Sequence, residues 1–432
     1  MPGNRTFEDD ALGRRLNESI SGEANSDTVA YDVLGRVSSR QNKLGGFIPT
    51  YIGSTGRMDF MTLPKGYVTD YAYFNHSGDN RLQTIQHKTP GGANISKLDY
   101  TYDASGQILS ITDQIDTAVP RKATGTNNSN PYDAAAQLTS WETRNTANNN
   151  VLSSHSYSYD LAGNRTAKSG STIGYNNLNQ LTSSGGNSSY AYDFNGNRSA
   201  APLLDYEWDA ANRMTAYTFG NLRVEYSYNA EGQMWRAVKK TNGVVAGELR
   251  YLWIGSQVRE QRSSGGNQVL QRYFDGGAIT NDATKLLALQ DHLGSVRELI
   301  DASTTLNIRA RYRYPEPYGF LPTKVSGDLD SSFRFANYFI EPYSGNVFTQ
   351  HRIYNLAEGR WLSRDPLGDI AFLSTYSKGK SWSERRALQR ESLRPAYLFV
   401  SNNSINNADM LGLICGIKVH RKESKNQVDK LT

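Results

Sequence analysis

The chain has 432 residues, which exceeds one compact globular core and predicts either several regions or one elongated array. Only 38% of the residues are hydrophobic, and Tyr (27) outnumbers Phe (14) and Trp (6) together, which argues against a large aliphatic core and favours short strands. The formal net charge is +5, but 47 basic and 42 acidic residues are interspersed, so we expect a solvated surface and no nucleic-acid partner.

Residues 1–28 are polar, and we expect them to form an irregular N-terminal segment. They lack the apolar core of a signal peptide. No run in the chain approaches the roughly 18 apolar residues that a membrane span needs. We therefore expect no membrane span, a cytoplasmic location before export, and secretion or surface display by a route that the sequence does not reveal.

Residues 29–245 repeat one short pattern. Its clearest copies are Tyr100-Thr-Tyr-Asp103, Tyr157-Ser-Tyr-Asp160, Tyr190-Ala-Tyr-Asp193, Tyr206-Glu-Trp-Asp209 and Tyr226-Ser-Tyr-Asn229. The turn residue recurs at 160, 176, 193, 209 and 229, so the later copies are 16 to 20 residues apart. A pattern with a nearly constant period is typical of a repeat architecture.

Each copy predicts a β-hairpin. Strand side chains alternate, so Tyr-x-Tyr places two rings on one face. Asp or Asn then begins the turn by bonding to the backbone two residues on, and Gly supplies the positive φ that the turn needs. One hairpin cannot bury its own face, so neighbours must stack into a long antiparallel sheet. Residues 115–131 and 141–155 are rich in Asn, Thr and Ser and are expected to be loops.

Residues 246–413 carry different motifs. They are Asp291-His-Leu-Gly-Ser-Val-Arg297, Tyr312-Arg-Tyr-Pro-Glu-Pro-Tyr-Gly319, Arg352-Ile-Tyr354, Ser363-Arg-Asp365-Pro366 and Asn402-Asn-Ser-Ile-Asn-Asn-Ala-Asp409-Met-Leu-Gly-Leu413. A short, basic, variable tail follows at 414–432.

A basic insertion at about 378–395 interrupts this region. Ser381 and Glu384 have the spacing of a capping box, which predicts a helix. On that helix Trp382 and Leu393 would share a weak apolar face, from which Leu388 falls away. We expect a solvated surface helix, with contact to an acidic polymer as the alternative.

Together, the repeats and motifs resemble the Rhs/YD-repeat family with its C-terminal Rhs repeat-associated core. The resemblance covers residues 30 to 412, and it is to the C-terminal part of toxin-complex C components and of bacterial Rhs polymorphic toxins. It implies an all-β fold, in which a spiral or solenoid of hairpins forms part of a hollow shell and ends in a core plug. It also implies that the protein encapsulates or presents a C-terminal effector. The implied partners are its own N-terminal shell region or a second shell chain, and that effector segment.

The toxin-complex branch of this family also implies self-cleavage, because its core is proposed to act as an aspartyl protease on its own backbone. The family's functional residues fall on Arg352, Asp365 and Asp409, and scission is expected between Leu413 and Ile414. Such chemistry needs one ionised carboxylate to activate water, one protonated carboxyl to donate, and a cation to fix them. The pattern departs from the family at Glu316, where Asp is usual, and at Ser404 and Met410, where Pro is usual or frequent.

Other interpretations remain open. Asp365 and Asp409 are also suited to turns or caps, and Arg352 to an ion pair. The chain is therefore either a self-cleaving aspartyl protease or not an enzyme. A non-enzymatic adhesion module whose Tyr faces bind cell-surface glycan is a second hypothesis, and an inactive truncated remnant is a third. No metal or organic cofactor is implied. His292 and His351 lack partners at ligand or triad spacing, so we expect structural roles.

Overall fold

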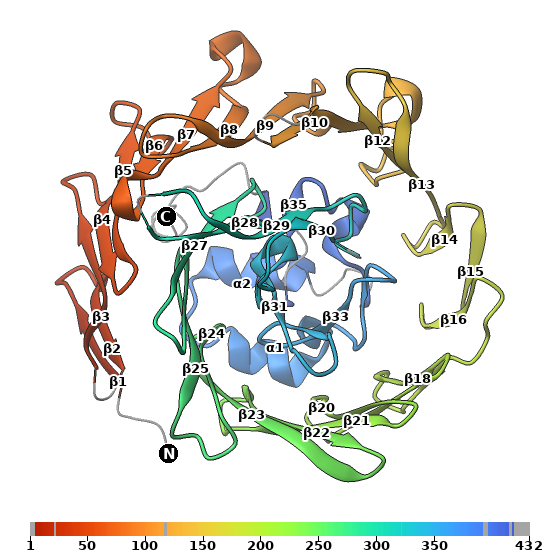
Figure 1. Ribbon diagram of the computed structural model, residues 1–432. Coiled ribbons are helices and arrows are strands. Elements are labelled where there is room, and N and C mark those ends of the chain that lie inside the picture. The colour runs from red at the N-terminus through yellow and green to blue at the C-terminus, as the bar shows by residue number, and fades with distance from the viewer. Residues whose placement is uncertain are drawn as a thin grey trace.

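Two long antiparallel sheets follow each other along the chain and curl into a spiral around its C-terminal part (Figure 1). The computed structural model describes residues 5–20, 23–115, 119–303, 305–320, 322–391, 396–413 and 417–418. The nearly all-β architecture confirms the all-β part of the predicted fold class, and the Rhs core plug stays a prediction. Within the described residues, no helix is long and apolar enough to cross a membrane.

The first sheet has 16 strands among the described residues, and each pairs with the next strand in sequence. They are β1 (Arg5–Asp9), β2 (Arg15–Ile20), β3 (Glu23–Tyr31), β4 (Val37–Asn42), β5 (Gly45–Tyr51), β6 (Met58–Thr62), β7 (Val68–Tyr73), β8 (Leu82–Lys88), β9 (Asn94–Tyr102), β10 (Ile108–Ile115), β11 (Arg121–Thr124), β12 (Ser140–Asn145), β13 (Val151–Tyr159), β14 (Arg165–Lys168), β15 (Ser171–Tyr175) and β16 (Leu181–Ser184).

The second sheet continues the meander with 14 strands in the described part of the chain. They are β17 (Ala191–Tyr192), β18 (Arg198–Ala201), β19 (Leu204–Trp208), β20 (Met214–Phe219), β21 (Leu222–Tyr228), β22 (Met234–Thr241), β23 (Val244–Ile254), β24 (Gln257–Arg262), β25 (Val269–Phe274), β26 (Gly277–Thr280), β27 (Lys285–Gln290), β28 (Val296–Asp301), β29 (Ile308–Arg313) and β30 (Thr323–Ser326).

Shorter elements make up the C-terminal part. A four-stranded sheet contains β31 (Phe339–Ile340), β32 (Val347–Phe348), β33 (Ile353–Asn355) and β34 (Arg360–Trp361), and β35 (Asn407–Ala408) pairs with β36 (Ile417–Lys418). The α-helices are α1 (Ile370–Tyr376) and α2 (Trp382–Glu391). The 3-10 helices are η1 (Pro64–Gly66), η2 (His76–Gly78), η3 (Thr126–Asn128), η4 (Phe335–Asn337), η5 (Pro366–Gly368) and η6 (Val400–Asn402).

The hairpin turns follow the chemistry expected from the repeat. At Asp160, carboxylate Oδ1 accepts the backbone N–H groups of Ala162 and Asn164 at 2.9 and 2.8 Å, and Gly163 has a φ of 78°. Asn229 bonds to Glu231 and Gln233 in the same way. A local side-chain-to-backbone bond therefore sets the turn, and Asp and Asn serve equally well.

The two aromatic residues of each repeat have different roles. The second one bonds to the preceding hairpin: the Tyr228 hydroxyl donates to the Met214 carbonyl at 2.7 Å, and the Trp253 indole N–H to the Met234 carbonyl at 2.6 Å. In several repeats an Arg from the preceding turn also lies over the ring, as Arg213 does 4.9 Å from the Tyr228 centroid. Each repeat is thus tied to its neighbour by more than the strand ladder.

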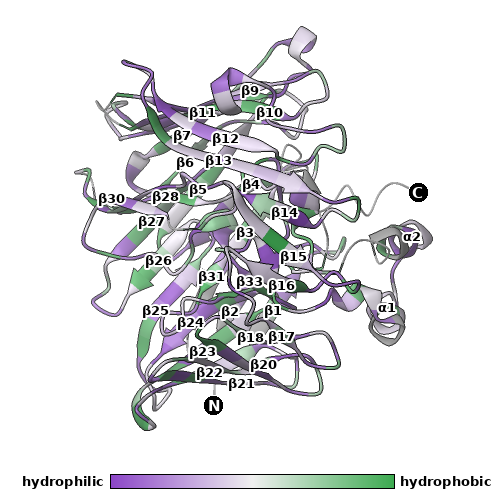
Figure 2. Ribbon diagram, turned by 90° about the vertical axis from the view of Figure 1, so that its right-hand side faces the viewer, coloured by the Kyte–Doolittle hydropathy of each residue, from purple (hydrophilic) through white to green (hydrophobic). Residues whose placement is uncertain are grey.

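The first aromatic residue of the repeat points into the spiral and is buried. Tyr100, Tyr157 and Tyr226 are each at most 5% exposed, and they belong to the hydrophobic clusters shared with the C-terminal part. The sugar-stacking hypothesis needs exposed rings, whereas these rings are used for packing. Hydrophobic and hydrophilic residues are mixed along the strands of both sheets (Figure 2).

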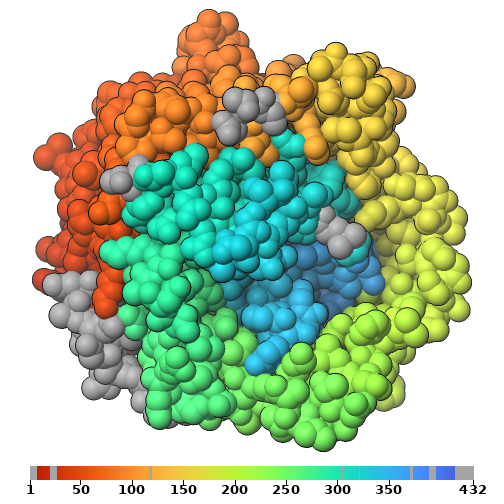
Figure 3. Space-filling view, in the orientation of Figure 1, coloured from red at the N-terminus to blue at the C-terminus, as the bar shows by residue number. Residues whose placement is uncertain are grey.

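The inner segment (residues 333–366 and 396–413) fills the centre of the spiral (Figures 1 and 3). Its amides bind the repeat turns: Asn402 Nδ2 donates to the Gly163 carbonyl and to Gln137 Oε1 at 2.7 and 2.9 Å, and Asn403 Nδ2 to Gln107 Oε1 at 2.6 Å. The Asn-rich motif near the C-terminus therefore binds the turn edge of the first sheet.

The spiral overlaps itself, because β25–β29 lie inside β4–β9. A cluster of buried side chains joins the two layers, among them Phe47 and Ile95 from outside and Leu287 and Ile300 from inside. Polar contacts cross the same seam. Ser96 Oγ donates to Glu298 Oε2 at 3.0 Å, and Arg40 pairs with Asp275.

Two expectations about local structure are wrong. The N-terminal segment 1–28 is not irregular, because β1, β2 and most of β3 lie within it. Residues 115–131 and 141–155 contain β11, most of β12 and part of β13. In both cases pairing with neighbouring strands outweighs the polar composition. The division expected between residues 245 and 246 stays a prediction, and the second sheet runs across it, because β23 spans this position and the sheet ends at Ser326.

The insertion at 378–395 contains α2, and α1 precedes it without having been expected. The capping box is present, since Glu384 Oε2 accepts from the Ser381 N–H at 2.6 Å and the Glu384 N–H donates to Ser381 Oγ at 3.3 Å. The expected apolar face is wrong: Leu388 is buried and Trp382 is 72% exposed. Leu393 lies outside the described residues. Both helices project from one end of the spiral (Figure 2).

Candidate functional site

Arg352 enters the interior from a tight turn between β32 and β33. The Thr349 hydroxyl donates to the Arg352 carbonyl at 2.8 Å and accepts from the Arg352 N–H at 3.2 Å, so one side chain fixes both backbone groups. The guanidinium is fully buried and lies 4.2 Å from the centroid of the Trp361 ring. A buried cation held over an indole face is rigid and needs anionic partners.

Asp365 stands at the start of the 3-10 helix η5. Its Oδ1 accepts from the Leu367 N–H at 2.9 Å, as an N-cap residue does, and Pro366 occupies the first helical position. Its own N–H donates to the Ala396 carbonyl at 2.8 Å. With Oδ1 engaged in this cap, Oδ2 faces the interior.

Asp409 follows β35, and its backbone is clamped by Tyr338. The Tyr338 hydroxyl accepts from the Asp409 N–H and donates to the Asp409 carbonyl, both at 2.9 Å. The side chain folds forward: Oδ1 accepts from the N–H groups of Gly412 and Leu413 at 2.8 and 3.1 Å. Asp409 thereby holds the backbone of the residue that precedes the expected scissile bond.

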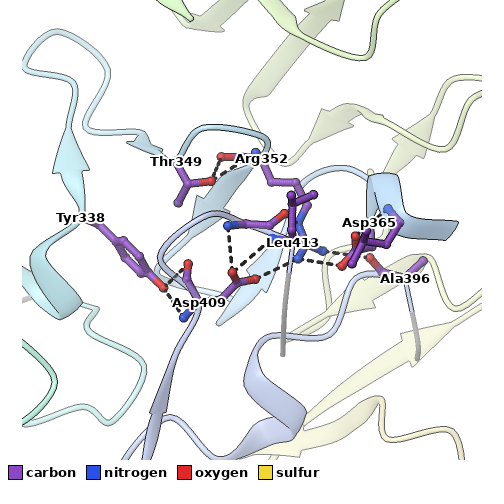
Figure 4. Close-up of polar contacts among 9 residues, drawn as sticks. Tyr338, Thr349, Arg352, Asp365, Ala396, Asp409 and Leu413 are labelled. Atoms are coloured by element: carbon purple, nitrogen blue, oxygen red, sulfur yellow. Dashed lines mark hydrogen bonds and ion pairs between the residues drawn. The ribbon is translucent and has the colours of Figure 1, made fainter. Parts of the chain in front are cut away.

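The three side chains meet at one nitrogen. Arg352 Nη2 lies 2.9 Å from Asp365 Oδ2 and 3.0 Å from Asp409 Oδ2 (Figure 4). Arg352 Nε also donates to the Gly412 carbonyl. Of the carboxylates, Asp409 is 1% exposed and Asp365 17%, so the second has access to water. The structure therefore brings together every residue that the sequence assigned to catalysis.

The expected cleavage position is only partly described. Leu413 is fully buried and packs with Leu367 and Leu388. Ile414 lies outside the described residues, as do Cys415 and residues 419–432 of the tail.

Several supporting residues were missed by sequence reasoning. Tyr338, Thr349 and Trp361 orient the site through contacts that span up to 71 residues, and none was singled out from the sequence as a functional residue. The Tyr338 position carried one usable signal, because it lies in an aromatic stretch of the hairpin before Arg352.

The two histidines singled out in the sequence are buried. His292 Nε2 lies 2.8 Å from the Ile405 carbonyl, and burial lowers the pKa of His292. Burial, with the charge of Arg352 added, lowers the pKa of His351 to about 4, so this imidazole is neutral at pH 7. The described residues contain no group of three or more His, Cys, Asp or Glu side chains that could hold a metal ion.

Known proteins share the pattern of this spiral of YD hairpins. The family model described as Teneurin YD-shell matches residues 65–375, which is most of the chain. The chain belongs to the Teneurin YD-shell family. As an Rhs/YD-repeat protein it is also similar to curated relatives. It is 24% identical over 383 residues to the probable deoxyribonuclease RhsB of Dickeya dadantii, covering 81% of this chain and 23% of the relative.

Two further relatives show how this YD-shell chain relates to longer proteins. The probable deoxyribonuclease RhsA of Dickeya dadantii is 24% identical over 379 residues, covering 81% of this chain and 23% of the relative. The tRNA3(Ser)-specific nuclease WapA of Bacillus spizizenii is 28% identical over 229 residues, covering 49% of this chain and 9% of the relative. This YD-shell chain spans less than a quarter of the length of these curated relatives.

Solved structures share the fold. The crystal structure of TcdB2–TccC3 superposes with a TM-score of 0.70 at 18% identity, covering 95% of this chain and 22% of that one. A Tc holotoxin pore of Photorhabdus luminescens superposes with a TM-score of 0.71 at 18% identity, covering 98% and 21%. At this identity, the likeness shows that this YD-shell chain has the fold of one part of a much longer chain.

Proposed function

We propose that the chain is the closing part of an Rhs-type shell that encloses an effector, and that Arg352, Asp365 and Asp409 cut the chain after Leu413. Within it, residues 29–245 act as shell repeats and 246–413 as the core that plugs them. The observation that carries the proposal is the buried Arg352 guanidinium, which holds both carboxylates at 2.9 and 3.0 Å.

The position of the bond relative to the carboxylates supports cleavage. Asp409 binds the N–H of Leu413, so the carbonyl of the same residue is within one peptide unit of that carboxylate. Arg352 contacts the Gly412 carbonyl, which fixes the backbone on the N-terminal side of Leu413. A bond held in this way reacts without the entropic cost of bringing two molecules together.

The chemistry balances with groups that the chain supplies. One carboxylate takes a proton from water as the water oxygen attacks the carbonyl carbon of residue 413, which forms a tetrahedral intermediate. The other carboxyl then gives its proton to the nitrogen of residue 414, and the C–N bond breaks. The products are a carboxylate at Leu413 and an amine at Ile414. Asp365 is the more exposed carboxyl and therefore the better placed to activate water.

Encapsulation needs more shell than this chain provides. Its own inner segment fills the centre of the spiral (Figure 3), so the volume for an effector must come from other shell walls. We propose that these walls belong to an N-terminal shell region or to a second shell chain. Secretion or surface display, by a route that the sequence does not reveal, is part of the same proposal. The buried tyrosines disfavour the glycan-binding alternative.

Intact-mass analysis of the purified chain tests the cleavage. We expect the wild type to separate after Leu413, and the variants Asp365→Asn and Asp409→Asn to stay whole. Asp160→Asn is a matched control, because other turns of the array carry Asn at the same position and the Asp160 carboxylate bonds to its own turn. A folded wild type of full-length mass, or cleavage in both site variants, would exclude the proposed reaction.

A further inference from the structure

Helices α1 and α2 form a helical hairpin that begins and ends at the candidate site. Its two ends meet there, because the Asp365 N–H donates to the Ala396 carbonyl at 2.8 Å. Arg352 Nη1 contacts the same carbonyl at 3.4 Å. The hairpin is therefore rooted on two of the three residues that the proposed cleavage uses.

The inner face of this hairpin covers Leu413. Leu388 of α2 is 6% exposed, and it forms one buried cluster with Leu367 and the fully buried Leu413. Leu373 and Tyr376 of α1 pack against that cluster. The side chain of the residue before the expected scissile bond thus lies in an apolar pocket that the hairpin helps to form.

The outer face of the hairpin has a different character. Trp382 is exposed and carries the Arg386 guanidinium 5.0 Å from its ring centroid. The capping box between Ser381 and Glu384 fixes where α2 begins and so which residues face inward. One helix therefore offers both a pocket residue, Leu388, and an exposed control position, Trp382.

We propose that the α1–α2 hairpin is the specificity element of the self-cleavage, and that it selects an aliphatic side chain of the size of leucine at position 413. The inference rests on the proposed cleavage. The pocket seats Leu413 so that its N–H reaches Asp409 Oδ1 at 3.1 Å. A larger side chain cannot enter without moving that backbone, because well-packed interiors tolerate added volume poorly.

A size-exchange experiment on the full chain tests this directly. Leu413→Phe should slow cleavage about tenfold or more, the discrimination that a hydrophobic pocket gives for a mis-sized group. Leu388→Ala removes volume from the pocket and should restore cleavage of Leu413→Phe in the double variant. Trp382→Ala, on the same helix but outside the pocket, should give no rescue. The readout is an intact-mass time course after refolding, with circular dichroism as the control for folding.

The outcomes separate the pocket from the cleavage itself. The pocket proposal is overturned if the wild type and Leu413→Phe are cleaved at the same rate. It is also overturned if the folded double variant is cleaved no faster than Leu413→Phe. In both cases the proposed cleavage itself still stands. A wild type that stays whole overturns both. If Leu388→Ala fails to fold, Leu388→Val offers a smaller cavity in the same position, and the same comparison applies.

Discussion

At the scale of single residues, Gly412 is the position at which the site tolerates least change. Its φ of +70° lies in the left-handed region, and a Cβ there would come 2.4 Å from Thr349 Oγ1 and 3.2 Å from the Arg352 N. The turn that it makes allows Asp409 to reach the N–H groups of Gly412 and Leu413. A side chain at this position would therefore disturb the carboxylate and the guanidinium together.

We expect Gly412→Ala to lower the free energy of unfolding by about 2 kcal/mol, from backbone strain and the close contact, and to slow the proposed cleavage. Urea denaturation and intact mass measure the two effects. Gly220→Ala is the matched control, because its φ is +56° and a Cβ there would have no described atom within 4 Å. Equal losses in the two variants would show that strain alone, without crowding of the site, is responsible.

The three polar residues of the site could be foreseen because each belongs to a motif with its own residue types. Arg352, Asp365 and Asp409 meet in the structure as that pattern predicts, and their catalytic role stays a prediction. The roles of Tyr338 and Trp361 could not be foreseen: the aromatic stretch around Tyr338 marks a hairpin, but it does not show which ring contacts the site. Their roles depend on which distant segment lies beside them.

At the scale of elements, the hydroxyl of the second tyrosine ties each hairpin to the one before it. We expect Tyr228→Phe to lower the free energy of unfolding by about 1 kcal/mol, since the bond to the Met214 carbonyl is lost and that acceptor stays partly buried. Thermal or urea denaturation measures this.

Tyr67→Phe provides the opposite case. The Tyr67 side chain is fully buried, and its hydroxyl has no hydrogen-bond partner among the described residues. Removing that hydroxyl should leave stability unchanged or raise it. If Tyr228→Phe and Tyr67→Phe had the same effect, the bond to the neighbouring hairpin would contribute nothing to stability.

Elements whose structure is set locally were the ones that the sequence predicted well. The turns at Asp160 and Asn229 and the capping box at Ser381 each depend on bonds over two to four residues. Strands β11 and β12 were missed because their polar composition favours loops. They form strands because their backbone groups pair with neighbouring strands, which composition does not reveal. Leu388 was assigned to the wrong face because its burial depends on Leu367 and Leu413, which lie outside the helix.

At the scale of the whole molecule, the seam between the two layers of the spiral is sensitive to acid. His87 lies in it, with Nδ1 2.9 Å from the Thr69 hydroxyl and Nε2 3.2 Å from the Gln290 carbonyl of the inner layer. This pairing fits the neutral imidazole with its proton on Nε2. Burial lowers the pKa of His87 to about 4.

The contribution of His87 to stability should therefore fall as the pH decreases from 6.5 to 4, because over this range the unfolded chain binds a proton at His87 and the folded chain does not. The loss reaches about 3 kcal/mol at pH 4. Burial raises the pKa of Glu298 in the same seam to about 7, which has the opposite effect, so a comparison with a His87 variant is needed to isolate this contribution. His87→Gln removes the titration, so the difference in unfolding free energy between wild type and variant should depend on pH in this window. Parallel curves from urea denaturation at pH 4 to 7 would contradict it.

The inner segment also fixes the order in which the molecule is completed. Asn406 Oδ1 accepts from the Ile108 N–H at 2.9 Å across 298 residues, so this contact forms only when the ends of a very long loop come together. On the ribosome, the strands of both sheets emerge before residues 396–413 do. Asp409 thus becomes available to Arg352 only after the strands of both sheets have been synthesised. In the proposed reaction, cleavage therefore depends on complete folding, and release of the tail marks the point at which folding is finished.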